Sequence, residues 1–340
     1  MFSDDYYPFN RGFETFLGFL GARETYYKHS WGSYYDFGFG DAEGYINSTS
    51  NTTRWGPELK GSYSTIVTAK RAIQVAEEHV AGRDTGGTDA PLFLYLPFQA
   101  VHGPLDVPTD DMFTEEQLAV LGSIRSEDIL RRKFAKIIYF LDKTLEGMFE
   151  RFDQLGLLNN TLVVVASDNG GCWSAGGSNI PYRGFKWTLF EGGVRAPALV
   201  WSKSESIIPV EARGTIYTGM MHALDWTPTL ANITGIQTEG MGKPLSGFDH
   251  WKAIIGQRPE SDPPVRGDLV LGRSAYEYDS DSDSMVLLDH PRGAYIHNGW
   301  KIIHGERIVG WFSFNPEDDT PYCPDCVTTP CNYYPYLNNT

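Results

Sequence analysis

The stretch "TLVVVASDNGG", residues 161–171, indicates a buried strand that ends in a polar loop. Its β-branched and apolar residues favour a strand over 162–166. Asp168 and Asn169 follow at once, and two glycines behind them allow the backbone to turn tightly. Carboxylate and amide oxygens at the end of a strand suit a hard cation such as Ca²⁺, although Asp-Asn-Gly-Gly is also a common turn without a ligand.

A strand–helix–strand order surrounds this stretch. Residues 64–80 and 127–154 place apolar side chains at intervals of three and four, which predicts two amphipathic helices. Between them the apolar run "PLFLYLPF" predicts a buried strand over 92–96. Strands that are apolar on both faces and joined by a helix indicate an α/β fold with a mostly parallel sheet sandwiched by helices. We therefore expect 92–96 and 162–166 to lie in one sheet.

Polar residues follow both predicted strands. His102 lies in the loop "QAVHGPLDVP", directly after the strand over 92–96. In parallel α/β sheets, ligands bind beyond the carboxyl ends of the strands. We expect His102 to lie on the same rim of the sheet as Asp168 and Asn169.

Composition excludes several classes of protein. The 340 residues are 41% hydrophobic and carry a formal net charge of −15, without a visible cluster of lysines and arginines. Nucleic-acid binding needs such a cluster, so this class is disfavoured. No apolar run approaches the roughly 18 residues of a membrane span. The opening "MFSDDYYPFN" lacks the basic and apolar regions of a signal peptide.

Glycosylation sequons point to a lysosomal or secreted protein. The motif N-x-S/T occurs at Asn47, Asn51, Asn159, Asn232 and Asn338. Several of these lie in turn-like polar stretches where a glycan would stand clear of the chain. Ordinary Asn-Thr turns in a cytosolic protein remain the alternative.

Four cysteines leave their pairing open. Cys172 is isolated, whereas Cys323, Cys326 and Cys331 form "CPDCVTTPC". A zinc knuckle would need a fourth ligand at suitable spacing, and none follows. In a chain with sequons we expect disulfides instead.

Five motifs in order resemble the sulfatases, and among them the arylsulfatase B (N-acetylgalactosamine-4-sulfatase) group. They are "FLYLPFQAVHGPLDVP", "VVVASDNGG", "RGFKWTLFEGGVRAP", "HALDWTPTLANITG" and "KPLSGFDHW". The resemblance covers residues 1–255 and returns weakly in "GAYIHNGWKII". It implies an alkaline-phosphatase-like fold, with a catalytic domain over 1–255 and a smaller, incomplete α+β domain over 256–340 that holds "GAYIHNGWKIIHGE" as a strand pair.

The resemblance implies a role for each of four residues. Asp168 and Asn169 match a calcium-binding pair. His102 matches a histidine that contacts the sulfate and donates a proton to the leaving alcohol, and Lys186 matches a lysine that holds a sulfate oxygen. A cation, an ammonium and an imidazolium together would balance the negative charge that sulfuryl transfer develops. We expect the four side chains to lie within about 10 Å of a common point.

Other parts of the family pattern are absent. Sulfatases carry a cysteine in C-x-[P/A]-[S/T]-R that is oxidised to the formylglycine nucleophile, and no cysteine of this chain has that context. The N-terminal aspartate pair that completes the calcium site is also missing, as is the first lysine–histidine motif. We therefore expect an N-terminally truncated fragment that is inactive alone and has half of a Ca²⁺ site.

Three functions remain in competition at this point. The first is hydrolysis of sulfate esters, of sulfated sugars or glycosaminoglycans or of aryl sulfates. The second is a phosphoesterase of the same superfamily, which would want further Asp and His ligands for two metals. The third is a non-catalytic glycan-binding or degenerate relative. Arg195 is expected to serve structure by pairing with Glu191, and the aromatic-rich residues 26–40 are expected mainly to pack.

Overall fold

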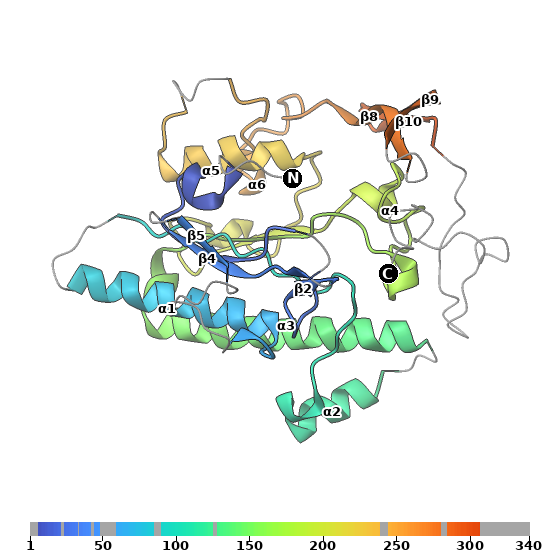
Figure 1. Cartoon of the computed structure of the whole chain (residues 1–340). Helices are drawn as coiled ribbons and strands as arrows, with labels where there is room; N and C mark the ends of the chain where they lie inside the picture. The colour runs from blue at the N-terminus through green and yellow to red at the C-terminus, as the bar shows by residue number, and fades with distance from the viewer. Residues whose placement is uncertain are drawn as a thin grey trace.

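The computed structural model describes residues 6–21, 24–32, 34–41, 44–47, 59–84, 90–124, 128–238, 244–279 and 284–306. Figure 1 shows three layers in the main body: a pair of long helices on one side, strands and extended chain in the middle, and two short helices on the other side. A separate antiparallel sheet formed by the C-terminal described residues lies at one end.

The helices and strands have the following bounds. The α-helices are α1 (Ser64–Asp84), α2 (Glu115–Gly122), α3 (Ile129–Gln154), α4 (Glu191–Val194), α5 (Trp226–Thr234) and α6 (Trp251–Ile254). The strands are β1 (Phe16–Gly18), β2 (Ser30–Trp31), β3 (Tyr34–Tyr35), β4 (Gly38–Asp41), β5 (Gly44–Asn47), β6 (Val163–Ala166), β7 (Ala198–Trp201), β8 (Asp268–Asp279), β9 (Ser284–His297) and β10 (Trp300–His304).

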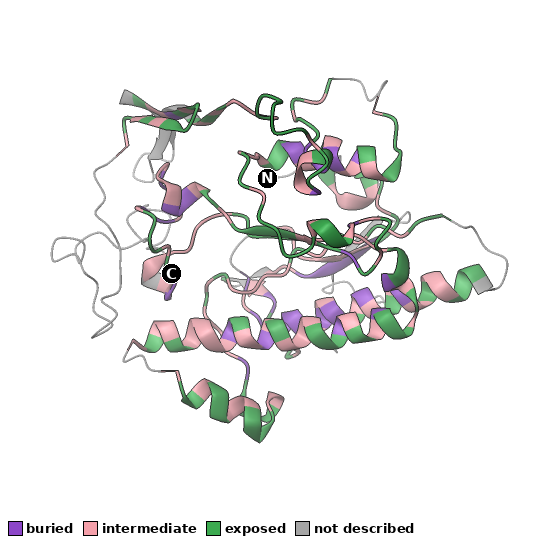
Figure 2. Cartoon of the chain, turned by 180° about the vertical axis from the view of Figure 1, so that it is seen from behind, coloured by how far each residue is buried: buried purple, intermediate pink, exposed green. Residues whose placement is uncertain are grey.

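Helices α1 and α3 lie side by side and form the largest core, which confirms both predicted helices (Figures 1 and 2). Small residues of α1, such as Ala72 and Ala76, are buried against Met148 and Phe152 of α3. Small side chains at a crossing let two helices approach closely. Asp128 caps the N-terminus of α3, because its carboxylate accepts the Leu130 N–H at 2.8 Å.

The predicted strand over 92–96 is wrong. These residues are extended but belong to no strand of the described chain. Leu92, Leu94 and Leu96 pack against the core between α1 and α3, whereas Phe93 and Tyr95 on the other side are 66% and 68% exposed. The apolar run therefore indicated correctly an extended chain on a helical layer. It carried no information on whether a neighbouring strand pairs with it.

Strand β6 confirms the strand expected over 162–166, but its neighbour runs in the opposite direction. Val163 lies opposite Trp201 and Ala166 opposite Ala198 of β7. The ladders between the described strands are all antiparallel, so the mostly parallel direction is not found there. A parallel return needs a long crossover, usually a helix, whereas residues 167–197 between β6 and β7 form loops, a 3-10 turn over Trp173–Ala175 and the short helix α4.

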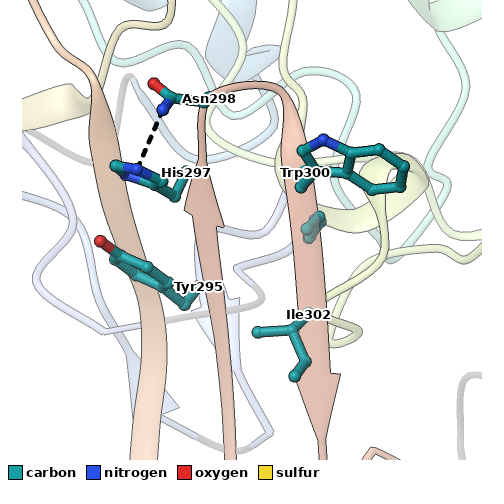
Figure 3. Close-up of a pocket in the computed structure, with 6 residues that line it drawn as sticks. Tyr295, His297, Asn298, Trp300 and Ile302 are labelled. Carbon is teal, nitrogen blue, oxygen red and sulfur yellow. Dashed lines mark hydrogen bonds between the residues drawn. The ribbon is translucent and has the colours of Figure 1, made fainter.

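Strands β8, β9 and β10 confirm the strand pair expected in "GAYIHNGWKIIHGE". Strands β9 and β10 join at Asn298 and Gly299, whose φ angles of 49° and 80° suit a two-residue hairpin turn. Tyr295, His297, Trp300 and Ile302 project from one face of this sheet (Figure 3). The domain boundary between residues 255 and 256 stays a prediction.

Helices α5 and α6 cover the other side of the middle layer. Trp251 and Ile255 pack with Ile208 and against Val200 of β7. None of the helices in the described ranges is both long and apolar enough to cross a bilayer.

Asp225 ties this layer to the chain that leads into β8. Its buried carboxylate accepts from the Arg266 guanidinium at 2.5 and 2.9 Å and from the His222 and Phe248 amides at 2.8 Å each. Burial raises the pKa of the Asp225 carboxyl, but the hydrogen bonds from Arg266 and from the two amides outweigh it and hold the pKa at about 2.

We predict that Asp225→Asn lowers the free energy of unfolding by about 3–5 kcal/mol, because Arg266 would keep a charge without its partner. Urea unfolding at pH 6 measures the effect. Asp262→Asn is the control: Asp262 pairs with Arg258 at 3.5 Å but its side chain is 45% exposed, so a loss below about 1 kcal/mol is expected. Equal losses of unfolding free energy in the two variants would contradict the conclusion that Asp225 joins this layer to the chain before β8.

Candidate active site

The structure brings His102 and Lys186 into contact. Lys186 Nζ lies 3.0 Å from His102 Nε2, although 84 residues separate them in the chain. His102 Nδ1 lies 2.6 Å from the Gly103 carbonyl oxygen. The carbonyl can only accept, so Nδ1 carries a hydrogen. The ammonium can only donate, so Nε2 offers its lone pair and the imidazole is neutral in this arrangement.

Tyr26 holds the loop that carries His102. Its hydroxyl donates to the His102 carbonyl at 2.9 Å and to the Gln99 carbonyl at 3.3 Å, and its amide donates to Asp106 Oδ2 at 3.1 Å. Burial and, next, the negative charge of Asp106 raise the pKa of Tyr26, so the phenol keeps its proton. Sequence reasoning placed Tyr26 in a packed aromatic stretch but missed this hydrogen-bonding role.

Close backbone packing joins the Asp-Asn-Gly-Gly loop to the loop of Lys186. The Gly170 amide donates to the Gly193 carbonyl at 2.9 Å, and the Lys186 amide donates to the Gly171 carbonyl at 3.2 Å. A Cβ atom on Gly170 would collide with the Gly192 carbonyl. Gly170, which follows Asp168 and Asn169, is therefore required because two backbones meet there.

Asn179 is a second residue that sequence reasoning missed. Its side-chain oxygen accepts the Gly171 amide at 2.7 Å, and its side-chain nitrogen donates to the Gly171 and Gly184 carbonyls at 2.8 and 3.3 Å. This amide thus fastens the same two loops. Its only sequence signal is an Asn in the Gly-Gly-Ser-Asn turn, a pattern too common to stand out.

Arg195 serves structure, as expected. Its guanidinium lies 3.6 Å from the Glu191 carboxylate one helical turn earlier, and 4.9 Å from the centre of the Tyr182 ring.

The described residues alone do not fit a calcium ion. Asp168 is exposed and Asn169 is half-buried. In the described part of the chain, no group of three or more His, Cys, Asp or Glu side chains could hold a metal. Calcium takes about six to eight oxygen ligands, and these two side chains supply two or three. The Asp168–Asn169 loop is joined to Lys186 through its backbone, and convergence of all four side chains stays a prediction.

Sequons and cysteines are only partly within the described residues. Asn159 and Asn232 are exposed, and the Asn232 amide donates to Asp249 at 2.7 Å. Asn47 lies in β5; Asn51 and Asn338 lie outside the described residues. Cys172 is disulfide-bonded, as expected for a cysteine of this chain. Cys323, Cys326 and Cys331 lie outside the described residues.

The family model described as Sulfatase matches residues 1–236, a span that contains His102, Asp168, Asn169 and Lys186. The chain belongs to the sulfatase family. Mouse (Mus musculus) arylsulfatase J is 32% identical over 250 residues, which cover 74% of this chain and 37% of that protein. Canis lupus familiaris N-acetylgalactosamine-6-sulfatase is 25% identical over 195 residues, which cover 55% of this chain and 33% of that protein.

The fold of this sulfatase is shared with solved structures. Ps i-CgsB in complex with k-i-k-neocarrahexaose matches with a TM-score of 0.64 at 24% identity, over 89% of this chain and 60% of that chain. The α/β, alkaline-phosphatase-like class is thereby confirmed. The chain spans about a third of the length of the curated relatives above, 37% and 33%.

A buried acid lies behind the His102 loop. Glu24 and His29 have side chains that are 1% and 0% exposed, with Glu24 Oε1 3.1 Å from His29 Nδ1. Gln99, three residues before His102, donates its side-chain amide to the Glu24 carbonyl. Burial raises the pKa of the Glu24 carboxyl to about 7, against the opposing effect of His29.

We predict that stability falls with rising pH because of Glu24. Because the pKa of the Glu24 carboxyl is raised in the folded state, its protonated form contributes its full stabilisation below pH 4.5. This contribution is lost as the pH rises through about 7. The loss between these pH values is at most about 3 kcal/mol. Glu24→Gln should flatten the pH dependence of the unfolding free energy, whereas Glu150→Gln at an exposed position of α3 should not. The same slope in Glu24→Gln and in the unmodified chain would contradict the prediction.

Proposed function

We propose that this chain supplies the sulfate-holding part of a sulfuric ester hydrolase of the arylsulfatase B type. The observation that carries the proposal is the 3.0 Å contact between His102 and Lys186, in a chain whose residues 1–236 match the sulfatase family. The two residues come from separate loops, yet both have the chemistry that binds a sulfate group. The Lys186 ammonium favours an anion beside it, and the neighbouring His102 Nε2 becomes a second donor to that anion when the imidazole is protonated.

The reaction would be hydrolysis of a sulfate ester. Overall, the oxygen of a water molecule forms a bond to sulfur, the bond from sulfur to the alcohol oxygen breaks, the alcohol oxygen takes a proton, and the remaining hydrogen of the water leaves with inorganic sulfate as hydrogen sulfate or passes to solvent. Lys186 would balance the charge on nonbridging oxygens. The Nε2 atom of His102 faces Lys186 with its lone pair, so the imidazole would first take up a second proton there and then donate it to the leaving oxygen, a role that suits a histidine side chain.

Calcium, when bound in the whole protein, would supply further positive charge to the sulfate oxygens. We propose Asp168 and Asn169 as two of its ligands. Because the described residues do not complete such a site, no step of the reaction is assigned to the metal here.

A sulfated carbohydrate is the proposed substrate class. One relative is named for N-acetylgalactosamine 6-sulfate, and a fold neighbour was solved with a carrageenan oligosaccharide, k-i-k-neocarrahexaose. The choice of the arylsulfatase B type, and of glycosaminoglycans, rests on the five motifs. A lysosomal or secreted glycoprotein is proposed because five sequons occur, two of them at exposed asparagines, and because Cys172 is disulfide-bonded.

We predict that Lys186→Ala weakens the binding of inorganic sulfate at least about tenfold, because it removes the charge nearest His102. Titration calorimetry with sodium sulfate at constant ionic strength measures the affinity. Lys203→Met is the matched control, since Lys203 pairs with Asp153 at 2.6 Å elsewhere on the surface. Equal affinity in Lys186→Ala and in Lys203→Met would refute the proposed site.

We also predict that the 340-residue chain alone does not hydrolyse a chromogenic aryl sulfate, with or without calcium. His102 and Lys186 stabilise charge, but the sequence contains no C-x-[P/A]-[S/T]-R motif to supply the family's nucleophile. Turnover that His102→Ala abolishes would contradict this and reveal a different nucleophile. Sulfate binding without turnover is the expected pair of results.

A further inference from the structure

The C-terminal sheet holds the turn that follows Lys186. Leu189 lies against Gly272 of β8, where a Cβ atom would come 2.7 Å from the Leu189 side chain. The Leu189 amide donates to Glu306 Oε2 at 2.8 Å. Arg292 of β9 donates to the Trp187 carbonyl at 3.3 Å. Two residues of the sheet, Gly272 and Arg292, and Glu306, which follows β10, thus make three contacts with Trp187 and Leu189 of one turn.

Arg292 and Glu306 form one unit across this turn. Arg292 Nη2 lies 2.7 Å from Glu306 Oε1, so the two carboxylate oxygens of Glu306 are used by Arg292 and by the Leu189 amide. The Glu306 side chain is 5% exposed and the Arg292 side chain 20%. A charge pair with so little exposure has lost most of its water and depends on these hydrogen bonds.

The turn needs such support because its backbone is strained. Trp187 has a φ of 82°, a left-handed value that is rare for a large side chain. Residues in this region cost roughly 1–3 kcal/mol and persist where their surroundings hold them. Lys186 directly precedes Trp187, and its ammonium lies 5.2 Å from the centre of the Trp187 ring. The direction of the Lys186 side chain therefore depends on the conformation of Trp187.

We propose that Arg292 and Glu306 are positioning residues for Lys186, a proposal that rests on the function proposed above. Their ion pair hydrogen-bonds to the Trp187 carbonyl on one side of the turn and to the Leu189 amide on the other. These hydrogen bonds keep the Trp187 backbone in the left-handed conformation and keep the Lys186 ammonium beside His102. Neither Arg292 nor Glu306 touches the sulfate in this account.

The test replaces the whole pair with apolar residues, Arg292→Met with Glu306→Leu. Net charge is unchanged, and replacing both partners avoids leaving one buried charge alone. The matched control is Lys301→Met with Glu191→Leu. That double variant removes the 2.8 Å ion pair between Lys301 and Glu191, which joins the same sheet to the start of α4 but not to the turn over 187–189.

Two readouts are compared among the unmodified chain, the two double variants, Lys186→Ala, and the triple variant that combines Lys186→Ala with Arg292→Met and Glu306→Leu. The first is the affinity for inorganic sulfate. We expect the Arg292–Glu306 double variant to bind about tenfold more weakly, and to have no further effect when Lys186→Ala is already present. The second is amide hydrogen exchange of residues 186–190. The Arg292–Glu306 double variant should lose protection at Leu189, and the control should keep both properties.

Each other outcome overturns a particular claim. Unchanged sulfate affinity in the Arg292–Glu306 double variant, or an equal loss in the control, overturns the positioning role. So does a full further loss in the Lys186→Ala background, which a general loss of structure would produce. If the unmodified chain does not bind sulfate, or if Lys186→Ala binds it equally well, the proposed function fails. If the Arg292–Glu306 double variant keeps the exchange protection of the Leu189 amide, the claim that this ion pair holds the turn is refuted, independently of sulfate.

Discussion

The candidate site depends on two backbones that meet with no side chain between them. Gly170 lies against Gly192 and Gly193 and donates its amide to the Gly193 carbonyl, while the Gly171 carbonyl accepts the Lys186 amide. Any side chain at Gly170 would force the two loops apart, because its Cβ would occupy the place of the Gly192 carbonyl. This contact and the hydrogen bond from the Lys186 amide to the Gly171 carbonyl hold the loop of Lys186 against the loop of Asp168 and Asn169.

Two further parts of the molecule hold the loop of His102 and the turn after Lys186, which the contact at Gly170 does not hold. On one side, Tyr26 is fully buried and donates to the loop of His102. On the other side, Gly272 of β8, Arg292 of β9 and Glu306, which follows β10, contact the turn after Lys186. Both supports come from segments far away in the sequence. A lysine and a histidine on irregular loops can keep a 3.0 Å contact only when the loops themselves are held in this way.

The sequence predicted local structure well where periodicity is strong. Helices α1 and α3 and strand β6 were predicted from apolar runs and apolar spacing, and the strand pair of β9 and β10 was expected in "GAYIHNGWKIIHGE". It could not predict pairing: the extended residues 92–96 lie on the helices without a ladder, and β7 pairs antiparallel with β6. An apolar run indicates that a segment is buried. Whether a neighbouring strand pairs with it, and in which direction, depends on the connection between the two strands. The hydrogen bonds of Asn179 and Arg292 were equally invisible, since both side chains bond to backbone atoms, Asn179 to Gly171 and Gly184 nearby in the chain and Arg292 to Trp187 far away in it.

The central claim is that His102 and Lys186 form one site for a sulfate group. A crystal of the chain soaked in selenate tests it most directly, because selenium scatters anomalously and selenate has the shape and charge of sulfate. The account predicts an anomalous peak within about 4 Å of both Lys186 Nζ and His102 Nε2, the range expected for an oxyanion hydrogen-bonded to both. A structure in which selenate binds elsewhere, while that position remains without a peak, would contradict it.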